Sequence, residues 1–313
     1  MKRRRVKSIK FIDLFCGIGS FTKSFSELGM ECVFACDIDK SVRQNYKVNY
    51  GEDIFGDIRK VAVEDVPDYD ILCAGFPCQA FSKIGYGKGS KDPRARLFFQ
   101  TLKFIDYHKP KIIIFENVKR LKTYSVFQDI LISLMQRDYS VEWRVLTASD
   151  YGLPQKRERI FIVGKRKDLK CAKTCFFDAL SSFERTDVTL STFFKKDFER
   201  KYSKTVRCGG LCGRIDSGHD WRKYWVRENG CRAVYTLQMH DVIRLQGFDK
   251  FNFVGFNRDI WKMLGNTIPT ILTSILGQRV LNLLQKERVE PHVSFSADKS
   301  TQTSYCTGDV PRS

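Results

Sequence analysis

Hydrophobic and polar positions alternate in blocks between residue 9 and about residue 165. Short, almost continuously apolar runs predict strands at 9–15, 31–35, 71–75, 112–115 and 160–163, because a strand that is covered on both faces has few polar positions. The amphipathic segments between them predict helices at 21–28, 41–49, 97–106 and 125–137. This alternation predicts an α/β fold with a doubly wound, mostly parallel, Rossmann-like sheet that binds ligands at the carboxyl ends of its strands.

The pattern changes at about residue 166, where apolar runs shorten and glycine, arginine and aromatic residues mix. We therefore expect a large lobe over 1–180 and a smaller, loop-rich lobe over 181–256. Helical periodicity returns in 271–284, and Pro269 suits a first helical turn, so a C-terminal helix within 257–288 should complete the large lobe. The polar, Ser/Thr-rich segment 289–313 is expected to be a disordered tail.

Charge and composition narrow the choice of partner. The 313 residues include 54 Lys plus Arg against 36 Asp plus Glu, a formal charge of +18, which favours a polyanion such as nucleic acid or an anionic membrane surface. No apolar run approaches the ~20 residues of a membrane span. The basic segment at residues 2–7 lacks a following signal-peptide core, so we expect an intracellular protein. Eleven cysteines, an odd number, indicate mostly small buried hydrophobic residues in a reducing compartment.

A glycine-containing turn follows the first predicted strand. Gly17 and Gly19 allow a tight turn and close approach of a ligand to the backbone, and Asp37, after the second strand, is placed to bind ribose hydroxyls. Position 22 is Thr, where a dinucleotide fingerprint has a third glycine. The turn therefore favours an adenosyl ligand without a pyrophosphate over NAD, with a purely structural turn as the alternative.

Two further candidates stand where predicted strands end. Cys78 follows the strand 71–75 through Phe76 and Pro77, where a nearby helix start would lower its pKa. Glu116 follows the apolar run 112–115, where burial would raise its pKa and let it present a proton to a ligand nitrogen. The alternatives are a buried structural cysteine and an acid that complements a helix dipole.

A third candidate group is the alternating segment Gln155-Lys-Arg157-Glu-Arg159. In an extended chain Gln155, Arg157 and Arg159 point to one side, while the two intervening residues point to the other. One face could therefore line a site, and the alternative is a solvated, charged edge.

Together these motifs resemble the C5 cytosine-specific DNA methyltransferases of the bacterial restriction–modification type. The resemblance runs from about residue 11 to 164 and again from about 237 to 284. It is carried by DLFCGIGSF, ACDID, GDI, GFPCQAFS, DPRARLFF, ENV, QKRER, RLQGF and GNTIP, in this order.

The resemblance implies a mechanism and a set of site residues. Cys78 would add to C6 of a cytosine that is flipped out of the duplex, Glu116 would bind N3 and the exocyclic amine, and Arg159 would hold O2, with Arg157 supporting the site. S-adenosyl-L-methionine would donate the methyl group. The implied residues of its site are Phe15, Gly17, Gly19, Asp37, Ile38, Asp57, Ile58, Leu97 and Asn266.

Some positions depart from the family pattern without removing a catalytic group. Ser20 replaces a usual glycine, Ile38 stands where an aromatic residue often faces adenine, and GNT replaces the commoner GNS. These departures bear on donor affinity more than on the chemistry.

The family resemblance also implies double-stranded DNA as the partner. The segment 166–232 would recognise the target, since arginine pairs bidentately with guanine in the major groove. A monomer is expected, with a cognate restriction endonuclease at the same site as a further partner. No metal is expected, although Cys208, Cys212, His219 and Cys231 loosely resemble zinc spacing. The candidate DNA-binding residues are Gln79, Ser82, Arg207, Arg214, Arg222 and Arg227.

Three rival functions share parts of this pattern. A tRNA cytosine methyltransferase would carry the same catalytic motifs. A nicotinamide-dependent oxidoreductase is disfavoured by the missing third glycine and the charge of +18. A non-catalytic DNA-binding protein would be expected to lose Cys78 or Glu116, and both are present.

Overall fold

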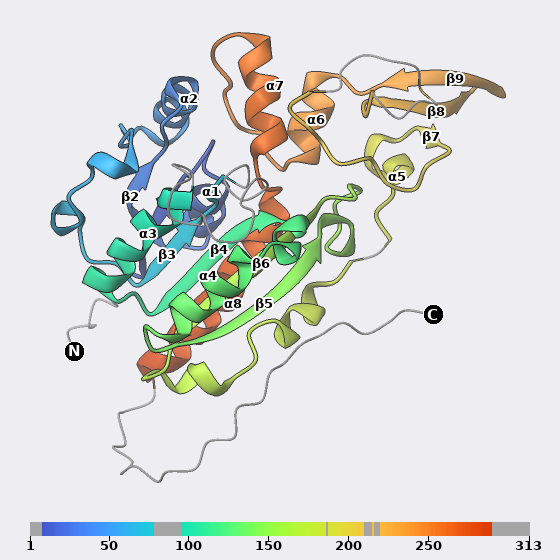
Figure 1. The fold of residues 1–313 in the computed structure, drawn as a ribbon. Coiled ribbons are helices and arrows are strands. Elements are labelled where there is room, and N and C mark those ends of the chain that lie inside the picture. Colours follow the sequence, from blue (N-terminus) through green and yellow to red (C-terminus); the bar gives the residue numbers. More distant parts are fainter. Residues whose placement is uncertain (1–7, 78–94, 186, 210–214, 216–219, 290–313) are drawn as a thin grey trace, which may run out of the picture.

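The computed structural model describes residues 8–77, 95–185, 187–209, 215 and 220–289. A six-stranded sheet in the order β2-β1-β3-β4-β6-β5 forms the centre of the molecule (Figure 1). The neighbours among β1 to β4 are parallel, which confirms the predicted α/β fold with a mostly parallel sheet. The strands are β1 Lys10–Leu14, β2 Glu31–Cys36, β3 Ile71–Ala74, β4 Ile112–Val118, β5 Tyr139–Thr147 and β6 Glu158–Arg166.

Strand β6 is antiparallel to both β4 and β5, which the hydrophobic pattern did not reveal. An apolar run indicates burial on both faces but carries no information on strand direction. Strand β5 itself was not predicted, because most of its residues are only half-buried at the edge of the sheet.

Helices cover both faces of the sheet (Figure 1). Along β4, Ile112 and Ile114 pack with α1 and α8 on one face, whereas Ile113 and Phe115 pack with α3 and α4 on the other. This alternation follows from the two-residue period of a strand. The helices are α1 Ser20–Glu27, α2 Lys40–Tyr50, α3 Ala95–His108, α4 Val126–Met135, α5 Leu190–Phe194, α6 Met239–Leu245, α7 Asn257–Asn266 and α8 Thr270–Val289.

The helix predicted from the periodicity of 271–284 is confirmed as α8, but the range 257–288 holds two helices rather than one. Helix α7 ends at Asn266, and Thr267 adopts an extended conformation before α8 begins. The interruption fits Pro269, because proline disfavours a helical conformation in the residue before it. The 3-10 segments are Ile58–Lys60, Val63–Asp65, Lys119–Thr123, Ala148–Asp150, Lys170–Lys173 and Asp178–Phe183.

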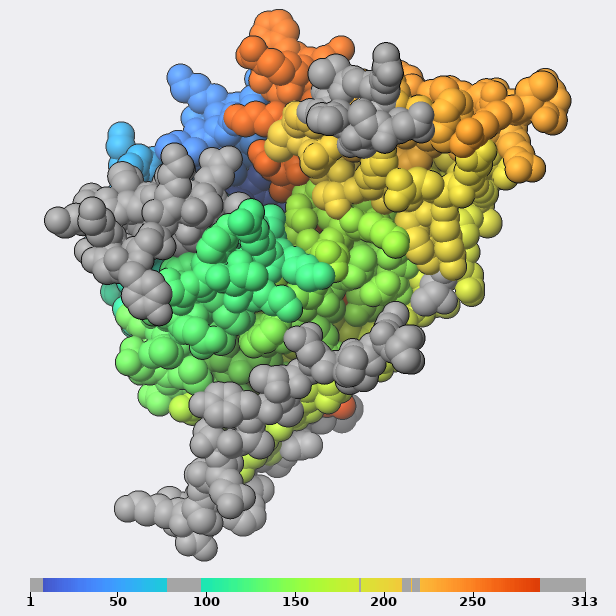
Figure 2. Space-filling view, turned by 45° about the vertical axis from the view of Figure 1, so that its right-hand side comes forward, coloured from blue at the N-terminus to red at the C-terminus, as the bar shows by residue number. Residues whose placement is uncertain are grey.

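A second lobe, which runs from α5 to α6, lies beyond the carboxyl ends of the parallel strands and is shown in yellow and light orange in Figures 1 and 2. It contains a three-stranded antiparallel sheet, which was not predicted for this region. Trp221 and Tyr224 are fully buried in its core. The strands are β7 Asp197–Phe198, β8 Lys223–Glu228 and β9 Cys231–Thr236.

The strand order reverses between β1 and β3, since the chain goes from β1 to β2 on one side and to β3 on the other. In open α/β sheets, ligands bind at the carboxyl ends of the strands next to such a reversal. The predicted glycine turn follows β1 and the predicted cysteine loop follows β3. None of the helices in the described ranges is long and apolar enough to cross a membrane.

Candidate active site

The turn after β1 has a backbone shape that requires glycine. Gly17 and Gly19 have φ values of 55° and 81°, in the left-handed region where glycine carries no steric penalty. A Cβ atom on Gly19 would also lie 2.8 Å from the ring of Tyr50. Phe15, just before the turn, has a φ of 56°, an uncommon conformation for a bulky residue.

Asp37, at the end of β2, holds this turn in place. Its Oδ2 accepts the Gly17 N–H at 3.0 Å and its Oδ1 accepts the Asp39 N–H at 2.9 Å. Burial raises the pKa of the carboxyl group, and the two backbone hydrogen bonds oppose that shift. Each oxygen retains a lone pair for a ligand hydroxyl. The next residue, Ile38, is 66% exposed and offers an apolar surface beside the turn.

The remaining candidates from the large lobe lie around the 3-10 segment Ile58–Lys60. Asp57 caps it and forms an ion pair with Arg59 at 2.5 Å, which lowers the pKa of Asp57 to about 2. Ile58 is buried, and the Gln100 amide on α3 donates to its carbonyl at 3.4 Å. Leu97, on the same helix, is half-buried. Arg59 already binds both carboxylate oxygens of Asp57. A ligand could therefore bind Asp57 only through the lone pairs that Arg59 leaves open.

A hydrogen bond connects the segment after β3 to the end of β4. The Asn117 side chain on β4 donates to the Phe76 carbonyl at 2.9 Å, and a Cβ atom on Gly75 would lie 3.3 Å from Oε2 of Glu116. The segment from Gly75 to Pro77 is therefore held against the end of β4. Cys78, Gln79 and Ser82 lie outside the described residues.

Glu116 and Arg159 meet across the β4–β6 pair. The Arg159 Nε atom lies 3.0 Å from Oε1 of Glu116, and Glu116 is 9% exposed. Burial raises the pKa of Glu116, and the two guanidinium groups of Arg159 and Arg157 only partly offset this shift. A buried carboxyl group with a raised pKa beside a guanidinium can donate a proton to a ligand and bind a polar ring atom at the same time.

Arg157 is completely buried and binds backbone carbonyls. Its Nη1 donates to Val206 at 2.6 Å, and its Nη2 donates to Gly265 and Thr267 at 2.9 and 2.6 Å. It thus joins the strand that carries Arg159 to the second lobe and to the end of α7. These contacts are those of a side chain that fixes the backbone around Arg159 rather than one that faces a ligand.

Gln155 makes a second connection of the same kind. Its amide nitrogen donates to the Leu245 carbonyl at 2.8 Å, and its oxygen accepts the Val206 N–H at 3.2 Å. The intervening Lys156 and Glu158 are exposed, so the predicted alternation is confirmed. Gln155 and Arg157, on the buried face, thus hold this segment to the second lobe. Arg159, within the same segment, forms the ion pair with Glu116.

Replacing Arg157 by methionine is expected to lower the free energy of unfolding by about 3 to 5 kcal/mol, because three buried carbonyls would lose their donor. Urea denaturation followed by circular dichroism measures this loss. Lys156→Met, one residue away on the exposed face, should change the stability by less than about 0.5 kcal/mol. Equal stability of the two variants would contradict the assigned role.

Asn266, at the end of α7, is exposed and lies next to the second lobe. Its Oδ1 accepts a hydrogen bond from the Cys208 thiol at 2.9 Å. A Cβ atom on the preceding Gly265 would lie 2.3 Å from the backbone nitrogen of Cys208. Glycine at position 265 therefore allows the second lobe to approach the end of α7.

Comparisons with known proteins show the family and the fold. The family described as C-5 cytosine-specific DNA methylase matches residues 9–208. The chain belongs to this family. It is 47% identical to the type II methyltransferase M.HaeII of Haemophilus aegyptius over 89% of this chain and 95% of the relative. It is 35% identical to M.DsaV of Dactylococcopsis salina over 89% and 87%. A methyltransferase structure from Entamoeba histolytica has a TM-score of 0.67 at 16% identity, covering 89% of this chain and 99% of that chain, and shows the shared fold.

Membership of the family makes the chain a methyltransferase. The candidate DNA-binding arginines of the second lobe differ in exposure. Arg207 is exposed next to Cys208, and Arg227 is exposed on β8. Arg222 instead binds the Asp220 carboxylate at 3.2 Å and lies over the Trp261 ring. Of the described candidates, Arg207 and Arg227 are exposed, whereas Arg222 is half-buried.

Several expected residues of this lobe cannot be placed. Arg214, Cys212 and His219 lie outside the described residues. Of the remaining two in the loose zinc pattern, Cys208 donates to Asn266, and Cys231 is exposed on β9.

The sequence did not single out Asn117 and Lys262, whose side chains connect different elements beside the site. Asn117 stands directly after Glu116, and its position at a strand end was the available signal. Lys262, on α7, forms an ion pair with Asp39 that no sequence pattern indicated, because 223 positions separate the two residues.

Proposed function

We propose that the enzyme transfers the methyl group of S-adenosyl-L-methionine to C5 of a cytosine that is flipped out of a specific short sequence in double-stranded DNA. The observation that carries this proposal is the contact of Glu116 with Arg159 beside the segment Gly75–Pro77. That segment leads directly into Cys78 in the sequence. The carboxyl group and the guanidinium match the polar edge of a cytosine ring. The thiol that follows in the sequence matches the C6 position.

The proposed roles of these residues follow from their chemistry. The Cys78 thiolate adds to C6, and the protonated Glu116 stabilises the charge that develops at N3. Arg159 donates hydrogen bonds to O2 and orients the ring. The C5 carbon then becomes nucleophilic and takes the methyl group, with S-adenosyl-L-homocysteine as the leaving product. Transfer of the C5 proton to water with departure of the thiolate restores the aromatic ring. The base must leave the stack, because the C6 face is covered in duplex DNA.

The residues around the β1 turn fit the methyl donor. When bound, S-adenosyl-L-methionine supplies an electrophilic methyl group. Asp37 retains lone pairs for ribose hydroxyls, and the exposed Ile38 gives an apolar surface for a purine. The glycine turn lets the ligand approach the backbone closely. We assign this site to Phe15, Gly17, Gly19, Asp37, Ile38, Asp57, Ile58, Leu97 and Asn266.

The partner follows from the charge and the family. A formal charge of +18 suits a phosphate backbone, and Arg207 and Arg227 are the described side chains that we assign to DNA. We further propose that the enzyme acts as a monomer on its target, with a restriction endonuclease of the same specificity as a cellular partner. A tRNA substrate remains the alternative within the same chemistry.

One experiment can identify the methylated base, its sequence context and the class of nucleic acid that is the substrate. Purified protein is incubated with S-adenosyl-L-methionine and either genomic DNA or tRNA, and both products are sequenced after bisulfite treatment. We expect methylated cytosines in one short DNA sequence and none in tRNA. Methylation of tRNA alone would overturn the DNA assignment, and absence of methylcytosine from both would overturn the proposed function.

A further inference from the structure

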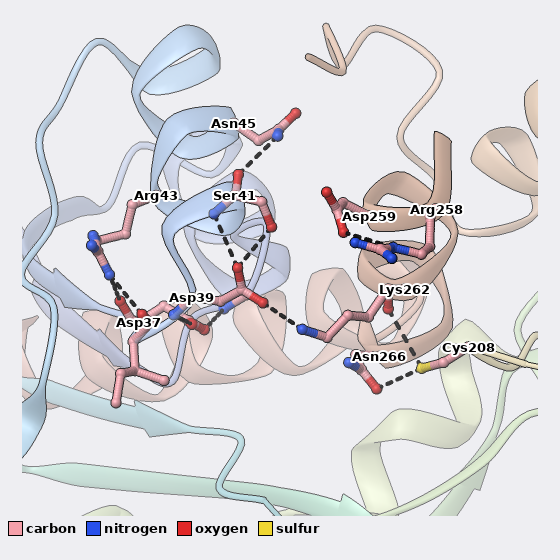
Figure 3. A network of polar contacts seen from close by, with 12 residues as sticks. Asp37, Asp39, Ser41, Arg43, Asn45, Cys208, Arg258, Asp259, Lys262 and Asn266 are labelled. Atoms are coloured by element: carbon pink, nitrogen blue, oxygen red, sulfur yellow. Dashed lines mark hydrogen bonds and ion pairs between the residues drawn. The ribbon is translucent and has the colours of Figure 1, made fainter. Parts of the chain in front are cut away.

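Helix α7 contacts the segment next to the proposed donor site through an ion pair. The Lys262 ammonium on α7 lies 2.7 Å from Oδ2 of Asp39. Asp39 also donates its backbone N–H to Asp37, the residue assigned to the ribose of the donor. Figure 3 shows these carboxylates and Lys262 facing one another between α2 and α7. The Lys262 side chain thus gives α7 a polar connection to the segment that carries Asp37, in addition to the apolar cluster that Ile18 and Val42 share with residues of α7.

The same turn of α7 also contacts the second lobe. Asn266 stands four residues after Lys262, on the same side of the helix. The Cys208 thiol lies 2.9 Å from Oδ1 of Asn266 and 3.5 Å from the Lys262 carbonyl (Figure 3). One helical turn is therefore held by the large lobe through Lys262 and by the second lobe through Cys208.

Other contacts hold α2 against this part of the chain, so the ion pair is not needed to keep the lobes together. The Asn45 side chain exchanges two hydrogen bonds with the backbone of Val254, both at 2.9 Å. Asn49 makes the same pair of contacts with Asn252, at 2.9 and 2.7 Å. Loss of the ion pair should therefore change the local placement of α7 rather than unfold the protein.

We propose that Lys262 is a positioning residue that, through Asp39, sets the distance between Asp37 and Asn266 and thereby the affinity for the methyl donor. This inference rests on the proposed function, which assigns both residues to the donor site. Lys262 touches neither the donor nor the cytosine in this scheme. It acts on binding, so its removal should change donor affinity more than the chemical step.

The test replaces Lys262 by methionine, which keeps the length of the side chain and removes its charge. We expect the Kd and KM for S-adenosyl-L-methionine to rise about twofold to fivefold, the range for loss of a partly exposed ion pair. The kcat at saturating donor should stay within about twofold of the wild type. Lys262→Arg should restore the wild-type Kd. Isothermal titration of the DNA-free protein and steady-state kinetics measure these quantities.

A matched control and a double-mutant cycle separate coupling from general damage. Lys47→Met removes an exposed ion pair with Asp53 of similar length, 2.6 Å, from the far end of α2, and it should leave the Kd unchanged. Asp39→Asn keeps the cap of α2, because asparagine caps helices as well as aspartate. Adding Lys262→Met to Asp39→Asn should raise the Kd no further.

The outcomes distinguish this inference from the proposed function. If the wild-type protein binds the donor and Lys262→Met binds it equally well, Lys262 has no positioning role and the proposed function stands. Additive effects of the two substitutions, or a loss of kcat and thermal stability that arginine does not restore, would also overturn the inference. Failure of the wild-type protein to bind the donor would instead overturn the proposed function, and the inference with it.

Discussion

Replacement of Cys78 by alanine is expected to lower methyl transfer to DNA by at least about 10⁴-fold, because loss of a catalytic nucleophile leaves no path to the C6 adduct. Incorporation of tritiated methyl groups into duplex DNA measures the rate, and a gel-shift assay measures DNA binding. Binding should persist, since the phosphate contacts come from basic residues elsewhere.

A second substrate tests the same residue independently. DNA that contains 5-fluorocytosine should form a covalent complex with the wild-type protein in the presence of the donor, because the fluorine atom prevents the final elimination. Cys78→Ala should form none, and the control Cys231→Ala, at an exposed position on β9, should react like the wild type. An adduct with the Cys78→Ala variant would show that another group is the nucleophile.

The sequence predicted the elements that are periodic or strongly apolar. Five of the six strands of the main sheet and its long helices follow from burial, which hydrophobic patterning records directly. It could not predict that β6 runs antiparallel, since burial is independent of strand direction. It also missed β5, whose half-buried edge position gives a mixed pattern.

The residues of the candidate site also divide into those that the local sequence indicated and those whose contacts only the fold reveals. Glu116, Arg159 and the glycine turn stand at strand ends, so their local sequence indicated both burial and a polar function. The role of Arg157 needed the fold, because its three carbonyl partners come from segments 49 to 110 positions away. The ion pair of Lys262 with Asp39 is equally non-local. Contacts of this kind depend on how the lobes pack and leave no trace in the local pattern.

Glutamine at position 116 is expected to lower kcat by about 10²- to 10⁴-fold, the usual contribution of general acid catalysis, or about 3 to 5 kcal/mol in activation free energy. Glutamine keeps the shape of the side chain and can donate a hydrogen bond, but it has no acidic proton that it could transfer to N3. Glu158→Gln is the matched control, because Glu158 is exposed and pairs with Lys119, and it should retain nearly full activity. A wild-type kcat in the Glu116→Gln variant would exclude the carboxyl group as a proton donor.

The pH dependence gives this role a second signature. Burial raises the pKa of Glu116 above its ordinary value, even though Arg159 lies 3.0 Å away and favours the charged form. The protonated group is the active one, so kcat should fall as the pH rises through that raised pKa. Glu116→Gln cannot lose this proton, and its much lower kcat should not show this alkaline decline. The same decline in both proteins would mean that another group controls the alkaline limb, and Glu116 would then act only by binding the base.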